Sequence, residues 1–274
     1  MTKIIVHDGK AHQDDFLAAC VCAYKLDAEI YRRKPDESEL LDSDCWILDQ
    51  GLDYNCSLHN FDHHHIEEKI CSFTMILDYF YNSNYREYMP NLKYLEIFDS
   101  YGPLAAAEFA GVNPDSLENI VSPIHLSIVR IFSKIEGLVS DPVYSVMKMI
   151  GEEICSQIES IENLLEVLKE DAVFIDYNNI RILDTTSCKT PENFRHDQLP
   201  TKIFCRIQKD HAHVILTKDS RSEGYFRMIS TNLNNVKFVK NDISEFTHNS
   251  GFLTSFNKYD KFYKILDNYV IMNI

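Results

Sequence analysis

The sequence predicts an α/β protein, because strand-like and helix-like segments alternate along its first half. Residues 4–6, 29–32 and 45–48 are short apolar runs of strand type, and residues 16–26 repeat apolar side chains at helical spacing. Strands that alternate with helices usually form a mostly parallel sheet. We therefore expect an N-terminal domain with such a sheet over residues 1–138.

A long helix and a strand-rich remainder complete the expected organisation. Residues 143–169 carry apolar side chains every three or four positions, and Asp141-Pro142 is a typical helix start. We expect a linker helix within residues 139–171 and a smaller α+β domain over residues 172–274. Further helical patterns cover 72–81 and 116–138, an apolar element at 92–98 ends at Asp99, and the last domain shows strand-like runs at 172–175, 180–183, 202–206, 213–216 and 225–228 before a helix at 254–269.

Charge is distributed unevenly along the 274 residues. The net charge is −15, but residues 1–177 hold 13 basic and 32 acidic residues, whereas residues 178–274 hold 14 and 10. An acidic first part suits cation binding, and a mildly basic second part could hold an anion. Acidic helices that merely keep the protein in solution explain most of the acidity equally well.

Cysteine use and the N-terminus indicate an intracellular protein. None of the eight cysteines forms a Cys-x-x-Cys pair, and no disulfide framework is expected. Met1-Thr2-Lys3 leads directly into a strand, and no apolar run reaches the ~20 residues that span a bilayer. We expect a cytoplasmic protein without a membrane partner.

Four stretches place metal-ligand side chains after short apolar runs, as at the carboxyl edge of a sheet. They are 7–15 (His-Asp-Gly-Lys-Ala-His-Gln-Asp-Asp), 47–51 (Ile-Leu-Asp-Gln-Gly), 61–65 (Phe-Asp-His-His-His) and 98–102 (Phe-Asp-Ser-Tyr-Gly). Each has a simpler explanation: a helix cap, a turn or a solvated loop. Five of the 11 histidines fall in two of the stretches, which favours one shared site.

The residue types indicate the metal and its chemistry. Carboxylates with a few imidazoles suit Mn²⁺, Fe²⁺, Co²⁺ or Zn²⁺, with the harder ions favoured. Two such ions ~3.5–4 Å apart can share a bridging carboxylate and promote attack of water on phosphorus. We expect two divalent ions, with Mn²⁺ as the first choice.

The chain resembles the melanocyte-proliferating-gene exonuclease family within the DHH phosphoesterase superfamily. Asp62-His63-His64 follows the superfamily signature, and His7 to Ala18 follows the family's N-terminal pattern of a His, a Gly and a His-x-Asp-acidic run. Asp49-Gln50-Gly51, residues 98–102, residues 149–153 and residues 246–252 also match, so the resemblance spans nearly the whole chain.

The resemblance implies roles for individual residues. His7, His12 and Asp49 would hold one metal, while Asp14, Asp49, His63 and Asp99 would hold the other. Asp62 would orient the His63 imidazole, and His64 would contact substrate phosphate as a catalytic residue. His248 and the backbone near Gly251 would grip phosphate or a terminal nucleotide. Weaker candidates for phosphate binding are the basic residues of the second domain near the aromatic Tyr225 and Phe226, namely Arg181, Arg195, Arg206, His213, Arg221 and Arg227.

The function implied is hydrolysis of a phosphodiester. We expect a 3′–5′ exonuclease or oligoribonuclease that releases nucleoside monophosphates from a short single-stranded RNA or a dinucleotide. A phosphomonoesterase or pyrophosphatase could use the same metals, and a non-catalytic nucleotide sensor could keep the same ligands. The motifs alone do not separate these alternatives.

Overall fold

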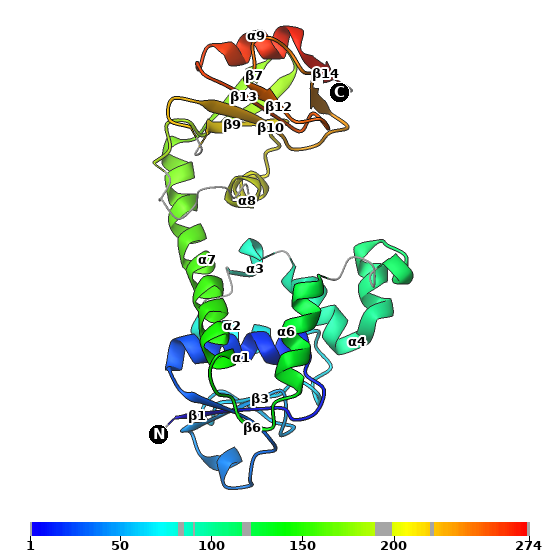
Figure 1. Ribbon diagram of the computed structural model, residues 1–274, viewed down its shortest axis with the longest axis vertical. Helices are drawn as coiled ribbons and strands as arrows, with labels where there is room; N and C mark the ends of the chain where they lie inside the picture. Colours follow the sequence, from blue (N-terminus) through cyan, green and yellow to red (C-terminus); the bar gives the residue numbers. More distant parts are fainter. Residues whose placement is uncertain are drawn as a thin grey trace. The chain divides into compact units, whose positions relative to one another are not determined.

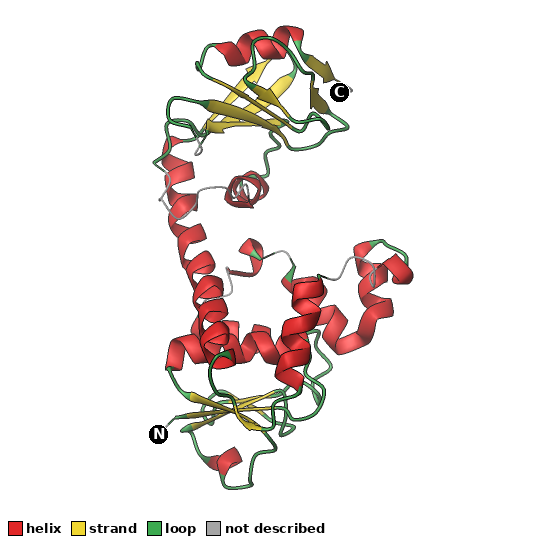
Figure 2. Ribbon diagram, viewed as in Figure 1, coloured by secondary structure: helices red, strands yellow, loops and turns green. Residues whose placement is uncertain are grey.

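The computed structural model describes residues 2–81, 85–89, 91–116, 122–189, 199–219 and 222–272. Contacts divide the chain into two units, residues 1–158 and 159–274, and the division falls within one long helix. Helices and strands, some of them parallel, are present in both units, which confirms the mixed α/β class (Figure 2).

The first unit is built on a six-stranded sheet with the order β4-β5-β3-β1-β2-β6 (Figure 1). Four central strands run parallel, and the two outer strands, β4 and β6, are antiparallel to their neighbours. The strands are β1 (Lys3–Val6), β2 (Glu29–Arg32), β3 (Cys45–Leu48), β4 (Tyr54–Asn55), β5 (Asn60–Phe61) and β6 (Gly137–Leu138). The three predicted strands of this domain are therefore confirmed.

Most helices of the first unit lie on one side of this sheet, as Figure 1 shows. They are α1 (Gln13–Leu26), α2 (Ser72–Phe80), α3 (Tyr85–Tyr88), α4 (Leu92–Ala110) and α6 (Pro123–Ser133), followed by α7 (Val143–Asp171). A short 3-10 helix, η1 (Glu39–Leu41), places Leu40 against Ile5, Cys45 and Ile47 on the sheet. Residues 116–138 were expected to be helical, but β6 pairs with β2 at residues 137 and 138.

Helix α7 packs very closely on α1 at Gly151. A Cβ atom at Gly151 would lie 2.0 Å from the backbone oxygen of Cys20. Helix propensity alone predicts that Gly151→Ala stabilises the protein by ~0.5–1 kcal/mol. The clash reverses the sign, so we expect a loss of about 1–3 kcal/mol in the free energy of unfolding.

Urea denaturation of Gly151→Ala measures this loss directly. Glu152→Ala, at the exposed next position of α7, is the matched control and should stay within about 0.5 kcal/mol of the wild type. An increase in stability for Gly151→Ala would contradict the close contact between the two helices.

The second unit contains a six-stranded sheet with the order β12-β13-β10-β9-β8-β7 and a two-stranded sheet of β11 and β14. Its elements after α7 are β7 (Val173–Tyr177), β8 (Ile180–Asp184), α8 (Leu199–Ile207), β9 (Val214–Lys218), β10 (Phe226–Ser230), β11 (Val236–Phe238), β12 (Phe246–Thr247), β13 (Leu253–Phe256), α9 (Lys261–Asn268) and β14 (Val270–Met272). Phe262, Ile265 and Leu266 of α9 pack on the sheet residues Ile182 and Leu216 in a buried cluster.

Two sequence predictions for this unit are wrong. Residues 202–206 form part of helix α8 and not a strand, because an apolar run of this length fits either structure and Ile203, Phe204 and Cys205 are buried as a helical segment. The last helix begins at Lys261, since Leu253–Phe256 pairs with β10 and β12 as strand β13.

All eight cysteines are free thiols, and seven of them are buried. Within the described residues, no helix is both long enough and apolar enough to cross a membrane.

Candidate metal centre

Three parallel strands deliver the metal-ligand side chains to one edge of the first sheet. His7 follows β1, Asp49 follows β3, and Asp62-His63 follows β5. Because β1, β3 and β5 are parallel neighbours, these carboxyl ends meet. The order β5-β3-β1 therefore brings together residues that are up to 56 positions apart in the sequence.

The imidazole of His63 lies among three carboxylates. Its Nε2 atom is 2.8 Å from Oδ2 of Asp99, 3.3 Å from Oδ1 of Asp49 and 4.0 Å from Oδ2 of Asp14. Burial opposes protonation of this ring, but the carboxylates of Asp49 and Asp99 outweigh burial and raise the pKa of His63 to about 9. In the absence of a metal, the His63 imidazolium is the cation that faces this group of acids.

Asp14 is the acidic residue of this group whose charge has the fewest stabilising contacts. Its side chain is fully buried, and neither carboxylate oxygen has a hydrogen-bond partner within the part of the chain that the structure describes. Burial, followed by the charges of Asp49 and Asp99, raises the pKa of Asp14 well above its ordinary value. A buried carboxylate without donors indicates that something else must satisfy it.

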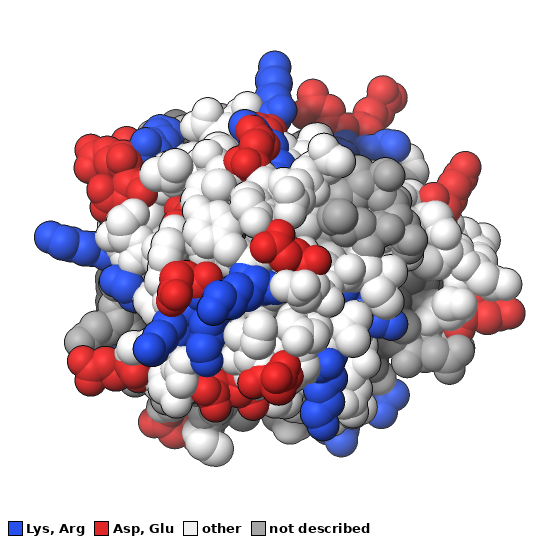
Figure 3. Space-filling view, turned by 90° about the horizontal axis from the view of Figure 1, so that it is seen from above, with Lys and Arg blue, Asp and Glu red and all other residues white. Residues whose placement is uncertain are grey.

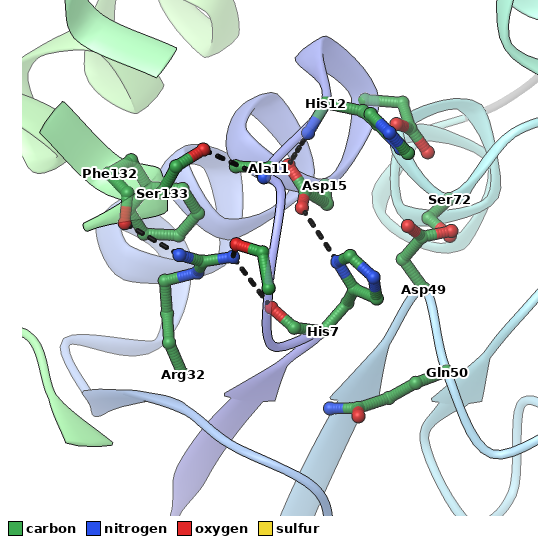
Figure 4. A network of polar contacts seen from close by, with 12 residues as sticks. His7, Ala11, His12, Asp15, Arg32, Asp49, Gln50, Ser72, Phe132 and Ser133 are labelled. Atoms are coloured by element: carbon green, nitrogen blue, oxygen red, sulfur yellow. Dashed lines mark hydrogen bonds and ion pairs between the residues drawn. The ribbon is translucent and has the colours of Figure 1, made fainter. Parts of the chain in front are cut away.

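His7 is oriented by the start of α1 and by a buried arginine (Figure 4). Its Nδ1 atom lies 3.5 Å from Oδ2 of Asp15, whose Oδ1 accepts a hydrogen bond from the backbone N–H of His12 at 3.1 Å. Arg32, only 2% exposed, donates to the carbonyl oxygens of His7 and Gly9, both at 3.0 Å, and to that of Phe132 at 2.7 Å. This guanidinium fixes the backbone of the loop that carries His7.

Asp49 adopts a backbone conformation that suits its place in the site. Its φ angle is 57°, in the left-handed region where Asp and Asn are tolerated better than most residues. The hydroxyl of Ser72, at the start of α2, donates to Oδ1 of Asp49 at 3.1 Å or to the carbonyl oxygen of Phe61 at 3.0 Å. Helix α2 thus holds both the Asp49 carboxylate and the end of β5.

Asp62 holds His64 and not His63, which corrects the sequence expectation. Nδ1 of His64 lies 2.6 Å from Oδ1 of Asp62, and the backbone N–H groups of His64 and Leu52 also donate to this carboxylate. Burial opposes ionisation of Asp62, but these donors prevail and lower its pKa. An ionised Asp62 can only accept, so Nδ1 of His64 carries the proton. Asp62 thus fixes the His64 ring, which is half exposed.

The side chains form three groups that could each hold an ion. They are His7, Asp15 and Asp49; His12, Asp14 and Asp99; and Asp49, His63 and His64, each with ligand atoms within 4.8 Å of one another. The unsatisfied oxygens of Asp14 and Asp15 and the carboxylate–imidazole donor set fit divalent ions such as Mn²⁺. Asp49 belongs to two groups, as a bridging carboxylate would.

The groups differ from the predicted ligand sets in three respects. Asp14 and Asp99 are grouped with His12, whereas Asp49 and His63, which were assigned to the same ion as these two, are grouped with His64. His7 and His12 were assigned to one ion, yet they fall in different groups although their rings stack at 5.9 Å. Asp15 was considered only as a helix cap, but it caps α1 and also faces His7. The His-x-x-Asp spacing from His12 to Asp15 is a capping-box pattern that could have placed the Asp15 carboxylate beside this loop.

Asp99 was expected at the carboxyl edge of the sheet, after an element whose type the sequence left open, and it does not follow a strand. It lies within helix α4, whose residues Leu92 and Leu95 are buried. Positions 92, 95, 96 and 99 share one helical face, and this spacing turns Asp99 toward the sheet edge. The run from Leu92 to Phe98 is too short for sequence periodicity to distinguish a strand from a helix.

The residues assigned to substrate in the second unit lie on and beside its large sheet. Arg227 is on β10, opposite Ser255 of β13. His248 is in the turn between β12 and β13, where its Nδ1 lies 2.9 Å from Oγ of Ser250. Gly251 has a φ angle of 77°, and a Cβ atom there would lie 2.6 Å from the carbonyl oxygen of Phe238. Their roles stay predictions.

Other basic residues of this unit are less suited to phosphate. Arg181 lies 2.6 Å from Asp176 and 2.5 Å from Asp210, and its backbone N–H donates to Nδ1 of His213. Arg195 and Arg221 lie outside the described residues. Basic and acidic side chains are interspersed on the face shown in Figure 3, so the positive charge of residues 178–274 does not gather there.

The site consists of carboxylates and imidazoles at the carboxyl edge of the parallel strands of an α/β domain. These features define its class as a candidate metal centre. Residues 3–77 match the model of the MYG1 exonuclease family, described as an uncharacterised protein family (UPF0160). The match covers the N-terminal motifs on which the resemblance to this family was based. It contains His7, Asp49, Asp62, His63 and His64, and it ends before Asp99.

The chain is also distantly similar to two solved structures. One is the pGpG-specific phosphodiesterase PggH from Vibrio cholerae, with 11% identity, a TM-score of 0.28, and 97% of each chain covered. The other is RecJ in complex with Mn²⁺ from Thermus thermophilus, with 11% identity, a TM-score of 0.26, and 97% of this chain and 51% of that chain covered. No curated protein matches the chain.

Proposed function

We propose that this protein is a metal-dependent phosphodiesterase that binds two divalent ions, with Mn²⁺ as the expected metal. The observation that carries the proposal is the set of three ligand groups, two of which share Asp49. These groups contain buried carboxylate oxygens without a hydrogen-bond partner among the described residues. The ligands would be His7, His12, Asp14, Asp15, Asp49, His63 and Asp99. Two ions bound there would activate water and neutralise charge on a phosphoryl group.

His64 has the geometry of a residue that contacts substrate. Its Nδ1 atom is occupied by Asp62, which disfavours coordination of a metal through this nitrogen. Its ring is half exposed, whereas the side chain of His63 is only 8% exposed. We assign His64 to the substrate phosphate, with Asp62 as the residue that positions it.

The expected substrate is a short single-stranded RNA or a dinucleotide, cleaved from one end to release nucleoside monophosphates, as by a 3′–5′ exonuclease or oligoribonuclease. The family match supports this assignment. His248, Gly251 and Arg227 are proposed to bind the phosphates of the substrate. Residues 1–138 would form the catalytic domain, residues 139–171 the linker and residues 172–274 the substrate-binding domain. We expect the enzyme to act in the cytoplasm.

The test combines metal content with turnover. Protein purified without chelator should contain about two metal ions per chain by elemental analysis, and should release mononucleotides from a labelled short RNA in Mn²⁺ but not in EDTA. His64→Ala should lose roughly 100-fold or more in kcat and keep its metal. His65→Ala, at the exposed next position, is the matched control and should keep both. Two bound ions with no cleavage of any phosphodiester would refute the proposal.

A further inference from the structure

A large cavity adjoins the metal centre within the first unit. Its volume is about 910 Å³, which lies in the range of ~300–1,000 Å³ usual for ligand sites. The start of α1, the first half and the last residue of α4, and helix α6 line it. His12 and Asp99 line the cavity and also belong to one of the three ligand groups. A molecule in the cavity therefore reaches the metal centre without leaving its own site.

Most of the cavity wall is apolar, with two aromatic rings on one helix. Tyr94 and Phe98 are one turn apart on α4, and their ring centroids are 6.0 Å apart. Phe98 is 40% exposed, and Leu126 of α6, also 40% exposed, lines the same space. Exposed aromatic rings beside a polar site are the surfaces on which proteins stack the bases of single strands.

The polar residues of the cavity match the rest of a nucleotide. Lys10 in the loop before α1 and Arg130 on α6 are exposed cations within a unit that is otherwise strongly acidic. Cations in such a place favour a phosphate group. Partial burial lowers the pKa of His125, so its imidazole is neutral near pH 7 and offers one donor and one acceptor. A base edge carries the complementary groups.

We propose that this cavity binds the terminal nucleoside of a single-stranded substrate, with the base against Tyr94 and Phe98. Its flanking phosphate lies toward Lys10 and the His12–Asp14–Asp99 group. The proposal rests on the proposed function and adds to it the part of the molecule that recognises the substrate end.

The first test measures, through kcat/KM, whether the Tyr94 ring contacts a base of the substrate. The substrates are the dinucleotide pdApdA and two analogues in which either the first or the second base is replaced by an abasic sugar. Wild-type protein in Mn²⁺ should cleave one of the analogues with a kcat/KM roughly 5- to 100-fold below that of the parent. Tyr94→Leu should reduce kcat/KM for the parent by a similar factor and abolish the difference between the parent and that analogue.

The matched control is Phe109→Ala, which removes a 53% exposed ring from the same helix outside the cavity. It should preserve the preference for the parent. The cavity proposal is overturned if the wild type cleaves all three substrates alike, or if Tyr94→Leu slows all three by the same factor.

A second test does not depend on turnover. Adenosine 5′-monophosphate is titrated calorimetrically into each protein in EDTA. We expect the wild type and Phe109→Ala to bind with equal affinity and Tyr94→Leu to bind at least 5-fold more weakly. If this binding is observed but no substrate is cleaved, the proposed phosphodiesterase activity is refuted and the proposed nucleoside site is retained. Absence of binding, or equal binding by Tyr94→Leu, would refute the nucleoside site. The nucleoside site would also be refuted if a second copy of the chain occupied the cavity and adenosine 5′-monophosphate did not displace that copy.

Discussion

Asp14→Asn is expected to make the metal-free protein more stable and to abolish its stabilisation by Mn²⁺. The carboxylate of Asp14 is fully buried, and neither oxygen has a hydrogen-bond partner among the described residues. An uncompensated buried carboxylate costs free energy, and an amide of the same shape removes the charge. We expect a gain of about 1–3 kcal/mol in the free energy of unfolding in EDTA near pH 7.

The pH dependence of this gain has a definite sign. The pKa of Asp14 is raised in the folded state by burial and by the charges of Asp49 and Asp99. A carboxyl group of this kind destabilises the fold at pH values above its pKa in the unfolded chain, and the cost grows as the pH rises toward the folded value. The advantage of Asp14→Asn in EDTA should therefore be larger at pH 7 than at pH 5.

Urea denaturation with and without Mn²⁺ measures both effects. At a Mn²⁺ concentration of 100 times the dissociation constant, the wild type should gain about 2.7 kcal/mol for each ion bound, and Asp14→Asn should gain much less. Asp8→Asn, which changes an exposed carboxylate of the same loop, is the control and should respond to Mn²⁺ as the wild type does. A loss of stability for Asp14→Asn in EDTA would contradict the metal-ligand role inferred from its burial.

Arg32→Lys is expected to cost about 2–4 kcal/mol in the free energy of unfolding, although it preserves the charge. The Arg32 guanidinium donates to four backbone carbonyl oxygens, those of His7, Gly9, Phe132 and Ile135. It also lies over the ring of Phe132, with 4.6 Å between its Cζ atom and the ring centroid. An ammonium group cannot reproduce this planar fork, so at least one buried carbonyl loses its partner.

The same substitution should weaken Mn²⁺ binding. Arg32 touches no ligand side chain, but it holds the loop from which His7 projects, as Figure 4 shows. Loss of a partner that orients a ligand typically reduces metal affinity by 10- to 100-fold. Calorimetric titration with Mn²⁺ gives the affinity, and urea denaturation gives the stability.

Arg33→Lys is the neighbouring control for Arg32→Lys. Arg33 forms a part-buried ion pair with Glu39, and both distances between the guanidinium and the carboxylate are 2.7 Å. This pair lies outside the metal centre, so Arg33→Lys should leave the Mn²⁺ affinity unchanged. Equal effects of Arg32→Lys and Arg33→Lys on Mn²⁺ binding would show that Arg32 does not position the site.

Much of the first unit could be predicted from local patterns. The strands at residues 3–6, 29–32 and 45–48 are short, apolar and separated by a helical pattern or a polar connection, so periodicity and length agree. The long helix was predictable for the same reason, since its apolar spacing persists over many turns. The short run at 202–206 was assigned wrongly as a strand, and the type of the element at 92–98 was left open, because the periodicity of such short runs fits a strand or a helix.

The chemistry of the centre was visible in the chain itself, since only residue type and spacing are needed to recognise a carboxylate–imidazole motif. The sequence alone thus identified His7, His12, Asp14, Asp49, Asp62, His63, His64 and Asp99 as candidates. The choice of contacts was decided in three dimensions. Asp62 contacts His64, and Asp15 contacts His7, because strand order and the start of α1 set these distances. Arg32 donates to the carbonyl oxygen of Phe132, which is 100 positions away in the sequence. Local sequence patterns hold no information on contacts between such distant residues. The role of Arg32 in fixing the loop, and the cavity beside the metal centre, could therefore be found only from the tertiary structure.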